Sequence, residues 1–189
     1  MMSDKHIRDV ETLLAEVEKG FRPEYLFFWG HRPRADGQIG KQCLSQWWMA
    51  PFTVGGIVYA TAEHYMMAEK ARLFGDDVAR ERVLAAPRPE DAKKLGRTVA
   101  GFDEAVWIAH RFAIIVRGNE AKFGQNAELG SYLSSTRGHI LVEASPEDRI
   151  WGIGLAEKDA DAGNPKKWRG LNLLGFALME VRERLRGLP

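Results

Sequence analysis

The sequence has little of several features, and each absence excludes a class of protein. Cys43 is the single cysteine, so no internal disulfide can form, which fits a reducing compartment. No apolar run approaches the roughly 20 residues that cross a bilayer. Residues 1–20 are amphipathic rather than signal-like. We therefore expect a soluble, cytoplasmic protein without a membrane partner.

Clustered metal ligands and excess charge are also lacking. The five histidines are scattered, with no HxxxH pair and no Cys/His cluster, so we expect neither a bound metal nor another cofactor. The 27 Lys and Arg residues nearly balance the 26 Asp and Glu residues, and the formal net charge is +1. This balance gives no overall attraction to nucleic acid, so no stable nucleic-acid partner is expected.

Length and composition indicate one globular domain. The 189 residues are 45% apolar and 28% charged, enough for one sizeable core or at most two small ones. No linker, repeat or low-complexity tract divides the sequence. Apolar residues between Ile7 and Val17 recur at helical spacing, and Gly20 can end the pattern. Residues 1–20 are therefore predicted to hold a peripheral N-terminal helix.

The stretch from Ile57 to Asp76 predicts the helix around which the rest of the chain is organised. Thr61 is a suitable N-cap before a run of good helix formers. Gly75 is a suitable stop, because glycine accepts the left-handed conformation in which many helices end. This helix also carries residues that an ordinary core helix would not contain.

One face of this predicted helix combines two charges with apolar groups. Four side chains fall within roughly 60° of each other at about 100° per residue, namely Glu63, Met67, Lys70 and Phe74. If the face looks inward, both charges need partners or a ligand, because a lone buried charge is costly. The structural alternative is that the acid favours the helix dipole and the lysine extends to water. Helix geometry leaves both interpretations open.

Strands and a loop are predicted before this helix. Residues 25–29, YLFFW, form an aromatic run of strand length. Residues 30–41 follow as a basic loop rich in glycine, for which a solvated surface is favoured over a contact to an anion. Residues 42–52 predict a strand and a turn. If that backbone is extended, Trp47 and Trp48 point to opposite faces, one toward the core and the other available to a ligand.

A hairpin then leads into the central helix, and mostly helices follow it. The two glycines between FTV and IVY predict a two-residue hairpin over residues 52–59. Lys93 belongs to a basic cluster that fits an exposed helix face better than a phosphate site, and Trp107 fits core packing better than a ligand platform. Helices are predicted over residues 76–86, 89–99, 103–119, 121–136 and 173–185, and a short buried strand over residues 139–145.

A turn near the C-terminal end holds further candidates. Residues 145–155 place Asp148 and Trp151 beside two glycines, which permit close approach of a ligand or of another strand. Asp148 has a structural alternative as a turn acid or as an ion-pair partner of Arg149. Asn172 is a plausible N-cap for the last predicted helix.

Several separated motifs resemble, in order, those of the NADAR family, also called YbiA-like N-glycosidases. They are SQWW, PFTVGGIVYATAEHYMMAEKA, GNEAKF, EASPEDRIWGIG and WRGLNLLGFALMEVR, and the resemblance covers residues 25–186. It implies one compact, mainly helical α+β domain with a few short strands over residues 1–189. It also implies a hydrolase that cleaves the N-glycosidic bond between a ribose and a nitrogen base or amine.

The resemblance leaves three functions open. The preferred substrate is a phosphorylated ribosylamino-pyrimidine intermediate of riboflavin biosynthesis, because the chain resembles the free-standing, compact enzymes of the family. The first alternative is an ADP-ribosyl glycohydrolase that removes ADP-ribose from guanine in nucleic acid. The second is a non-catalytic module that binds a nucleotide or ADP-ribose.

Site residues follow from the resemblance position by position. Glu63 and Asp148 are the expected catalytic carboxylates, one stabilising the sugar cation and orienting water, the other protonating the leaving nitrogen. Lys70 either holds a phosphate or carboxylate as a charge or attacks an opened ribose as a neutral amine. The charged role is preferred, because a nearby Glu63 would favour the protonated form. The expected substrate-binding residues are Phe28, Trp29, Gly30, Ser45, Gln46, Trp47, Trp107, Trp151, Gly152 and Asn172.

One of these positions departs from the common family pattern. Gln46 stands where many members have asparagine, so a contact to the substrate there differs in reach. The tryptophans can stack on the flat base, since such stacking is worth about 1–3 kcal/mol per base.

Overall fold

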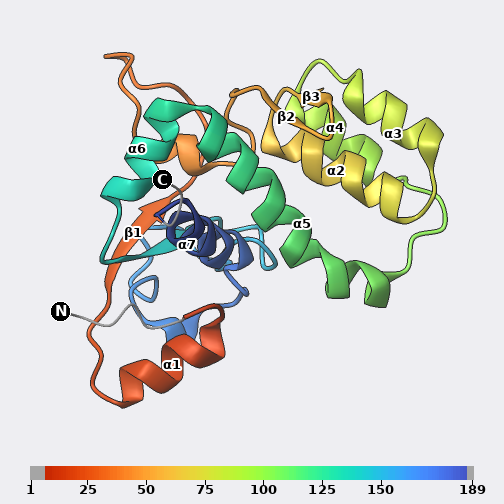
Figure 1. Cartoon of the computed structure of the whole chain (residues 1–189). Helices are drawn as coiled ribbons and strands as arrows, with labels where there is room; N and C mark the ends of the chain where they lie inside the picture. The colour runs from red at the N-terminus through yellow and green to blue at the C-terminus, as the bar shows by residue number, and fades with distance from the viewer. Residues whose placement is uncertain (1–6, 187–189) are drawn as a thin grey trace. The chain divides into compact units, whose positions relative to one another are not determined.

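A computed structural model describes residues 7–186, which form a mainly helical α+β fold with a few short strands (Figure 1). This is the predicted fold class. No helix in this part of the chain is both long enough and apolar enough to cross a membrane. In chain order the elements are α1 (Val10–Glu18), β1 (Glu24–Phe28), the 3-10 helix η1 (Lys41–Leu44), β2 (Phe52–Val54), β3 (Ile57–Tyr59), α2 (Ala62–Leu73), α3 (Asp77–Leu84), α4 (Pro89–Gly96), α5 (Glu104–Gln125), α6 (Ala127–Ser135), β4 (His139–Glu143), the 3-10 helix η2 (Pro165–Lys167) and α7 (Leu173–Arg186).

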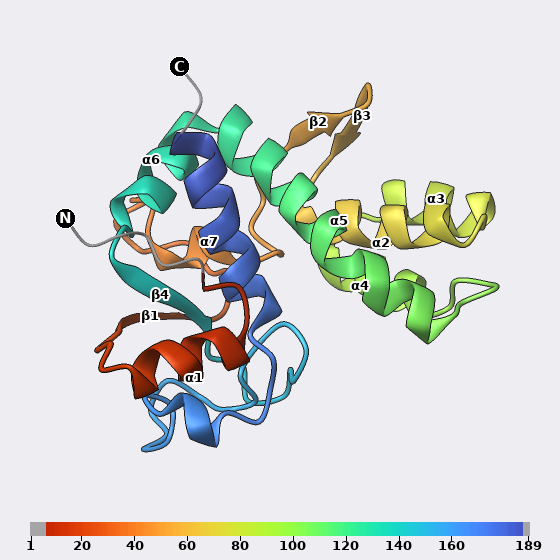
Figure 2. The ribbon, with the colours of Figure 1, turned by 60° about the horizontal axis from the view of Figure 1, so that its bottom comes forward.

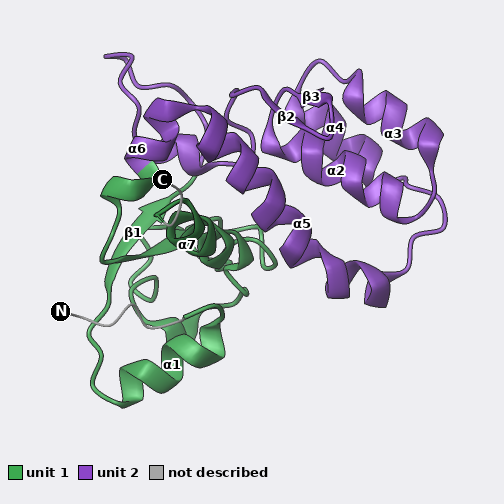
Figure 3. Cartoon of the chain, viewed as in Figure 1, with its two compact units in different colours: residues 1–29, 133–189 green, residues 30–132 purple. Residues whose placement is uncertain are grey.

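The chain forms two compact units, drawn in different colours in Figure 3. Unit 1 combines residues 1–29 with residues 133–189, and unit 2 is the continuous segment 30–132. Unit 1 therefore depends on pairing between segments that lie far apart in the sequence. Unit 2 contains the central helix that the sequence predicts.

Unit 1 is built on two parallel strands. Figure 2 shows β1 beside β4, and in their register Leu26 lies opposite Leu141. The helix α7 packs against β4. A Cβ at Gly175 would meet the carbonyl oxygen of Leu141, so glycine is needed where the helix meets the strand. Leu141 and Phe176 are both fully buried in the core of this unit.

The N-terminal helix is shorter than the predicted stretch. An Asp9 carboxylate oxygen accepts from the backbone N–H of Thr12 at 2.6 Å and caps α1, and Gly20 follows the helix with a φ of +96°. Residues 1–6 of the prediction lie outside the described residues. The helix contacts η2, where Lys166 pairs with Glu18 at 3.3 Å.

Unit 2 is organised around α2, as the sequence predicts. The hairpin of β2 and β3 closes through Gly55 and Gly56, whose positive φ angles of 58° and 80° suit a tight two-residue turn. The helices α3, α4 and α5 all pack against α2. The approach of α5 depends on Gly118, where a Cβ would collide with the ring of Tyr65. Tyr65 is almost fully buried.

The strand predicted over residues 42–52 is wrong. Residues 41–44 form η1 and a turn follows it, because the carbonyl oxygens of Cys43 and Ser45 both accept from Lys122 Nζ, at 2.7 and 2.8 Å. Two oxygens bound to one nitrogen at these distances lie closer together than about 6.8 Å, the spacing of alternate residues in a strand. The expectation that Trp47 and Trp48 point to opposite faces of an extended backbone fails with it.

The helix boundary predicted near Asn119 is also wrong. The helix α5 continues to Gln125, and only Asn126 separates it from α6. The Asn126 side chain donates to the carbonyl oxygens of Lys122 at 2.8 Å and Pro51 at 3.2 Å, which holds the backbone at this break. Asn119 therefore lies inside a long helix rather than at its end.

Candidate functional site

The first turn of α2 places Glu63 in a buried position. Thr61 has the extended φ of an N-cap, −144°, and its hydroxyl accepts from the backbone N–H of His64. The backbone N–H of Glu63 donates to the carbonyl oxygen of Gln46 at 3.0 Å. Glu63 itself is only 3% exposed. A carboxylate at this end of a helix interacts favourably with the helix dipole. The functional and the structural interpretation of Glu63 both predict an acid at this position.

His64 anchors the same turn, a role that the sequence interpretation missed. Its Nε2 lies 3.0 Å from the carbonyl oxygen of Ala86 and its Nδ1 lies 2.7 Å from the Thr61 hydroxyl. Since a carbonyl only accepts, Nε2 carries the proton and Nδ1 accepts from Thr61. Burial lowers the pKa of His64, which favours this neutral form.

Lys70 lies two turns further along α2, in an aromatic setting. Its Nζ donates to the carbonyl oxygen of Gly96 at 2.8 Å, and it lies 4.2 Å from the ring centre of Phe102 and 5.7 Å from that of Trp107. Burial lowers the pKa of Lys70. The contacts of its amine are a carbonyl and two rings, and its role as a charge or as a nucleophile stays a prediction.

The predicted face of α2 does look inward. Met67 packs against Gly96, where a Cβ would collide with its side chain, and the rings of Phe74 and Phe102 are 5.3 Å apart. Trp107 is 9% exposed and one of its faces lies toward Lys70. Its contacts support the core interpretation of this tryptophan.

The turn after η1 brings three predicted binding residues together. Ser45 Oγ accepts from the backbone N–H of Trp47 at 3.2 Å, and the Ser45 carbonyl is bound by Lys122. Gln46 Oε1 accepts from Asn119 Nδ2 at 2.9 Å. Lys122 is fully buried, and burial lowers its pKa from 10.5 to about 7. Asn119 and Lys122 were not predicted as site residues, although both lie in the GNEAKF motif.

Trp47 lies among basic side chains. The ring of His31 is 5.4 Å from the Trp47 ring, and Lys93 Nζ is 5.7 Å from the ring centre. Trp47 is half-buried. This arrangement provides a flat apolar surface beside two groups that can carry positive charge.

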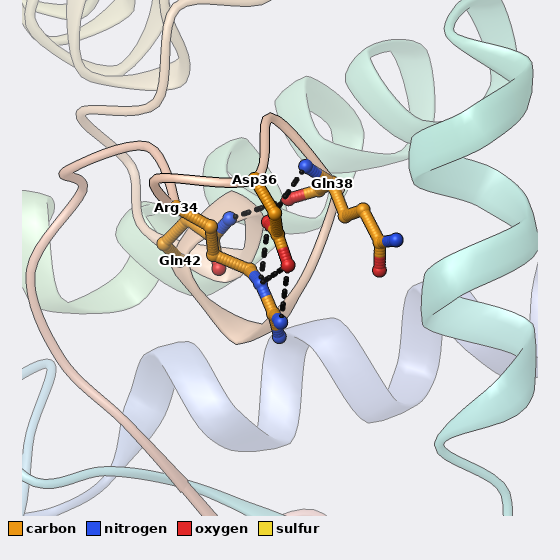
Figure 4. Close-up of polar contacts among 4 residues, drawn as sticks. All are labelled: Arg34, Asp36, Gln38 and Gln42. Carbon is orange, nitrogen blue, oxygen red and sulfur yellow. Dashed lines mark hydrogen bonds and ion pairs between the residues drawn. The ribbon is translucent and has the colours of Figure 1, made fainter.

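The basic loop before η1 is exposed but ordered by its own contacts. Figure 4 shows Arg34 paired with Asp36, at 2.7 Å between Nη2 and Oδ2. The guanidinium holds the pKa of Asp36 below its usual range. The backbone N–H of Gln38 donates to the same carboxylate, and Gln42 Nε2 donates to the Gln38 carbonyl at 3.1 Å. The solvated loop predicted for residues 30–41 is confirmed by the exposure of residues 31–38.

In unit 1, Asp148 closes the late turn. Its Oδ1 accepts from the backbone N–H groups of Ile150 at 2.9 Å and Trp151 at 2.8 Å. These are the contacts of a turn acid, so the structural alternative accounts for Oδ1. Glu63 belongs to unit 2 and Asp148 to unit 1, and their action as a catalytic pair stays a prediction.

Gly152 and Asn172 form the framework of this turn. A Cβ at Gly152 would lie 2.8 Å from the carbonyl oxygen of Glu143, so the close approach is to β4. Asn172 has a φ of +51° and does not cap α7 as predicted. Its amide donates to the Leu141 carbonyl at 2.9 Å and accepts from the Glu143 N–H at 3.0 Å, which ties the turn to β4. Asparagine tolerates this backbone better than most residues.

The aromatic positions before the loop divide into core and surface. Phe28 is fully buried in β1, and its contact with the substrate stays a prediction. Trp29 is 62% exposed, and Gly30 follows it with a φ of +77°. Trp151 is half-buried, and its carbonyl oxygen accepts from the N–H of Leu174 at 3.1 Å.

Comparison with known proteins identifies the family. The model of the NADAR domain matches residues 27–186, close to the range predicted from the motifs. The chain belongs to the NADAR family. Similar proteins include N-glycosidase R617 of Acanthamoeba polyphaga mimivirus, 41% identical over 165 residues, with 85% of this chain and 95% of that protein covered.

Two further relatives bear on fold and activity. N-glycosidase YbiA of Escherichia coli strain K12 is 34% identical over 135 residues, which cover 71% of this chain and 76% of YbiA. The NMR structure of E. coli YbiA matches with a TM-score of 0.68 at 28% identity, over 88% of this chain and 87% of YbiA. The maize protein named Riboflavin biosynthesis protein PYRR, chloroplastic, is 35% identical over 136 residues, or 68% of this chain and 20% of PYRR.

These comparisons confirm three predictions made from the sequence. The family resemblance and the mainly helical α+β fold are both borne out. The enzyme class is borne out as well, because relatives that align with most of this chain are named N-glycosidases, which are hydrolases of N-glycosyl bonds.

Proposed function

We propose that this NADAR protein hydrolyses the ribosyl C–N bond of phosphorylated ribosylamino-pyrimidine intermediates of riboflavin biosynthesis. The names of R617 and YbiA support the bond that is cleaved, and the name of the maize relative supports the pathway. The observation that carries the proposal is the buried Glu63 at the start of α2, bonded through its backbone to Gln46. We also propose that residues 1–189 act as one NADAR domain, because the family model matches residues of both units.

The reaction needs a negative group near the sugar. As the C–N bond breaks, positive charge builds on the anomeric carbon and negative charge on the departing nitrogen. In the proposal, Glu63 stabilises the sugar cation and orients the attacking water, as carboxylates do in glycoside hydrolases. A positioned acid or base of this kind contributes roughly 10²- to 10⁴-fold to the rate, so loss of Glu63 should be conspicuous.

Asp148 supplies the second carboxylate of the proposal. The two backbone N–H groups on its Oδ1 hold the carboxyl group in one orientation. In the proposal, this carboxyl group hands a proton to the leaving nitrogen. Its turn role and its catalytic role are compatible, because the turn uses only the acceptor capacity of one oxygen.

Lys70 has two chemically distinct roles in the proposal, as a nucleophile in its neutral form or as a charge that holds the phosphate. The neutral amine adds to the C1=N double bond of the ring-opened ribosylamine. Both amine protons pass to the pyrimidine nitrogen as its bond to C1 breaks, which leaves a free amino-pyrimidine and an imine between Lys70 and C1. Water then hydrolyses the imine between Lys70 and C1, which releases ribose 5-phosphate and restores the amine. In the electrostatic role, the protonated amine would hold the phosphate instead.

Trp47 is the proposed platform for the pyrimidine. Its ring is half-buried, and stacking of a base on such a ring is worth about 1–3 kcal/mol. Lys93 beside it provides positive charge for a phosphate of the same substrate, and the His31 ring offers a hydrogen-bonding group there.

The test compares two substrates with the purified protein. Release of ribose 5-phosphate from a ribosylamino-pyrimidine phosphate is measured beside release of ADP-ribose from an ADP-ribosylated guanine oligonucleotide. Turnover of the pyrimidine is the expected result. Release from the oligonucleotide alone would refute the substrate assignment, and binding of ADP-ribose without any turnover would refute the enzyme.

A further inference from the structure

The carboxamide of Gln46 is held in one orientation. Its Oε1 accepts from Asn119 Nδ2 at 2.9 Å, and the same Nδ2 donates to the carbonyl oxygen of Ile115 at 3.0 Å. An oxygen in place of this Nδ2 would face the Ile115 carbonyl oxygen, so Asn119 must present its NH₂ group there. Gln46 must then direct its Oε1 toward Asn119. The NH₂ group of Gln46 is therefore not bonded to Asn119.

That NH₂ group is a buried donor. Gln46 is 6% exposed, and its Nε2 has no acceptor among residues 7–186. The fully buried Asn119 likewise keeps its Oδ1 without a donor in this part of the chain. Buried amide groups are normally satisfied, because a missing hydrogen bond is unfavourable there. An oxygen atom of a ligand would satisfy the donor of Gln46.

Two residues one turn apart on α5 hold the segment that carries this donor. Asn119 and Lys122 are three positions apart and therefore lie on one face of the helix. Lys122 Nζ binds the carbonyl oxygens of Cys43 and Ser45, directly before Gln46. On its other side, the Gln46 carbonyl accepts from the N–H of Glu63. The backbone of residues 43–46 is thus fixed between α5 and the start of α2.

We propose that Gln46 Nε2 donates a hydrogen bond to a ribose oxygen of the substrate, and that Asn119 and Lys122 are positioning residues that present this donor. The ribose is the part of the substrate concerned, because Gln46 is bonded to the residue assigned to the sugar cation. The site would then favour substrates that have a hydrogen-bond acceptor at this position, because Asn119 makes Gln46 present its NH₂ group there. This inference rests on the proposed function and adds a contact that determines which part of the substrate is recognised.

Gln46→Glu changes this polarity with little change in size. One carboxylate oxygen can still accept from Asn119, while the other replaces the donor with an acceptor. The expected loss in kcat/KM is about 100-fold, the size found when one donor to a reacting group is removed. The matched control is Gln38→Glu, because Gln38 is exposed in the loop before η1. It should change kcat/KM less than about twofold.

Asn119→Asp tests the positioning role without altering Gln46. An aspartate offers no N–H, so Gln46 would turn its NH₂ group toward position 119 and present its oxygen to the substrate. A loss similar to that of Gln46→Glu is expected, with the thermal unfolding of both variants recorded as a check on folding. Wild-type kcat/KM in either folded variant would overturn the proposal.

A second measurement on the wild-type protein does not depend on any variant being stable. The sequence has four glutamines, so ¹⁵N-labelled glutamine gives a simple set of side-chain NH₂ signals. Ribose 5-phosphate should shift the NH₂ signals of Gln46, identified by their absence in Gln46→Glu, and leave those of Gln42 in place. The shift should be weakened or lost in Lys122→Met, because the carbonyls of Cys43 and Ser45 lose the lysine that ties this segment to α5. Unchanged Gln46 signals in wild type bound to ribose 5-phosphate would overturn the proposal.

The outcomes separate this inference from the proposed function. If Gln46→Glu turns over the ribosylamino-pyrimidine phosphate as fast as the wild type, only the role of Gln46 is refuted. Absence of turnover in the wild type refutes the proposed function itself.

Discussion

The buried amine of Lys122 should make the stability of this protein depend on pH. Its side chain is fully buried, and burial lowers its pKa from 10.5 to about 7. Between these two values the unfolded chain keeps a proton that the folded chain has released. Because the unfolded state then binds more protons, the free energy of unfolding rises with pH across this interval.

The size of this effect follows from the shift. One pKa unit corresponds to about 1.4 kcal/mol, and the proton difference integrated from about pH 7 to about pH 9 gives about 2 kcal/mol of added stability. The useful window ends there, because burial raises the pKa of Cys43 from 9.0 to about 11. Above pH 9 the folded chain keeps the thiol proton that the unfolded chain loses. This contribution lowers the free energy of unfolding as the pH rises, opposite to the contribution of Lys122.

The assay is urea unfolding at a fixed temperature and at several pH values within this window. In Lys122→Met the overall stability changes, because Cys43 and Ser45 lose their donor, but the pH-dependent gain should fall by about 2 kcal/mol. Lys94→Met is the matched control. Lys94 is exposed and pairs with Glu90 at 2.9 Å, so its loss should leave the slope unchanged. Equal slopes in wild type and Lys122→Met would refute the reasoning.

Substitutions and trapping at three other positions separate structural roles from catalytic ones. Asp148→Asn keeps an acceptor for the turn, so it should lower kcat at least about 100-fold while the unfolding temperature stays close to wild type, and an unchanged kcat would leave only the turn role. Borohydride added during turnover should reduce an imine on Lys70, detected by mass spectrometry, whereas no adduct would indicate the electrostatic role. Gly118→Ala should lower the free energy of unfolding by about 1–3 kcal/mol in urea, because its Cβ would meet Tyr65, and a neutral result would mean that α2 and α5 can move apart.

Local patterns were sufficient to predict the central part of unit 2. Thr61 and Gly75 mark the two ends of α2 through cap and stop preferences that act within a few residues. The hairpin follows in the same way from two adjacent glycines. The spacing of Glu63 and Lys70 also predicted that they share one face of the helix and that this face contacts other elements. The shared face follows from helical geometry alone.

Contacts between distant residues account for what the sequence did not predict. Lys122 resembles any solvated lysine on a helix, yet it binds carbonyls almost 80 positions earlier and thereby prevents a strand at Cys43 and Ser45. Asn119 gave no local signal of its bond to Gln46. The GNEAKF motif was the available signal, because a polar residue and a lysine three positions apart lie on one helix face.

Contacts that local patterns do not show also determine the surroundings of two residues in unit 1. Asn172 has the residue type of an N-cap, but the carbonyl and N–H groups of β4 bind its amide and hold its backbone in the left-handed region. Phe28 lies in β1, which pairs with β4, and its side chain is buried. In both cases the strand β4 makes contacts that no local pattern shows, through residues 29 and 31 positions from Asn172 and through Glu143 opposite Phe28.

Single-turnover hydrolysis by Glu63→Gln tests the central claim most directly. The rate of ribose 5-phosphate release from the ribosylamino-pyrimidine phosphate is measured for wild type, for Glu63→Gln and for Glu69→Gln. Glu69 is a second buried acid on α2 that pairs with Arg72 at 3.0 Å, so its substitution controls for the loss of a buried charge. The account predicts a loss of at least about 100-fold for Glu63→Gln alone, with ribose 5-phosphate still bound. A wild-type rate in Glu63→Gln, or an equal loss in Glu69→Gln, would contradict it.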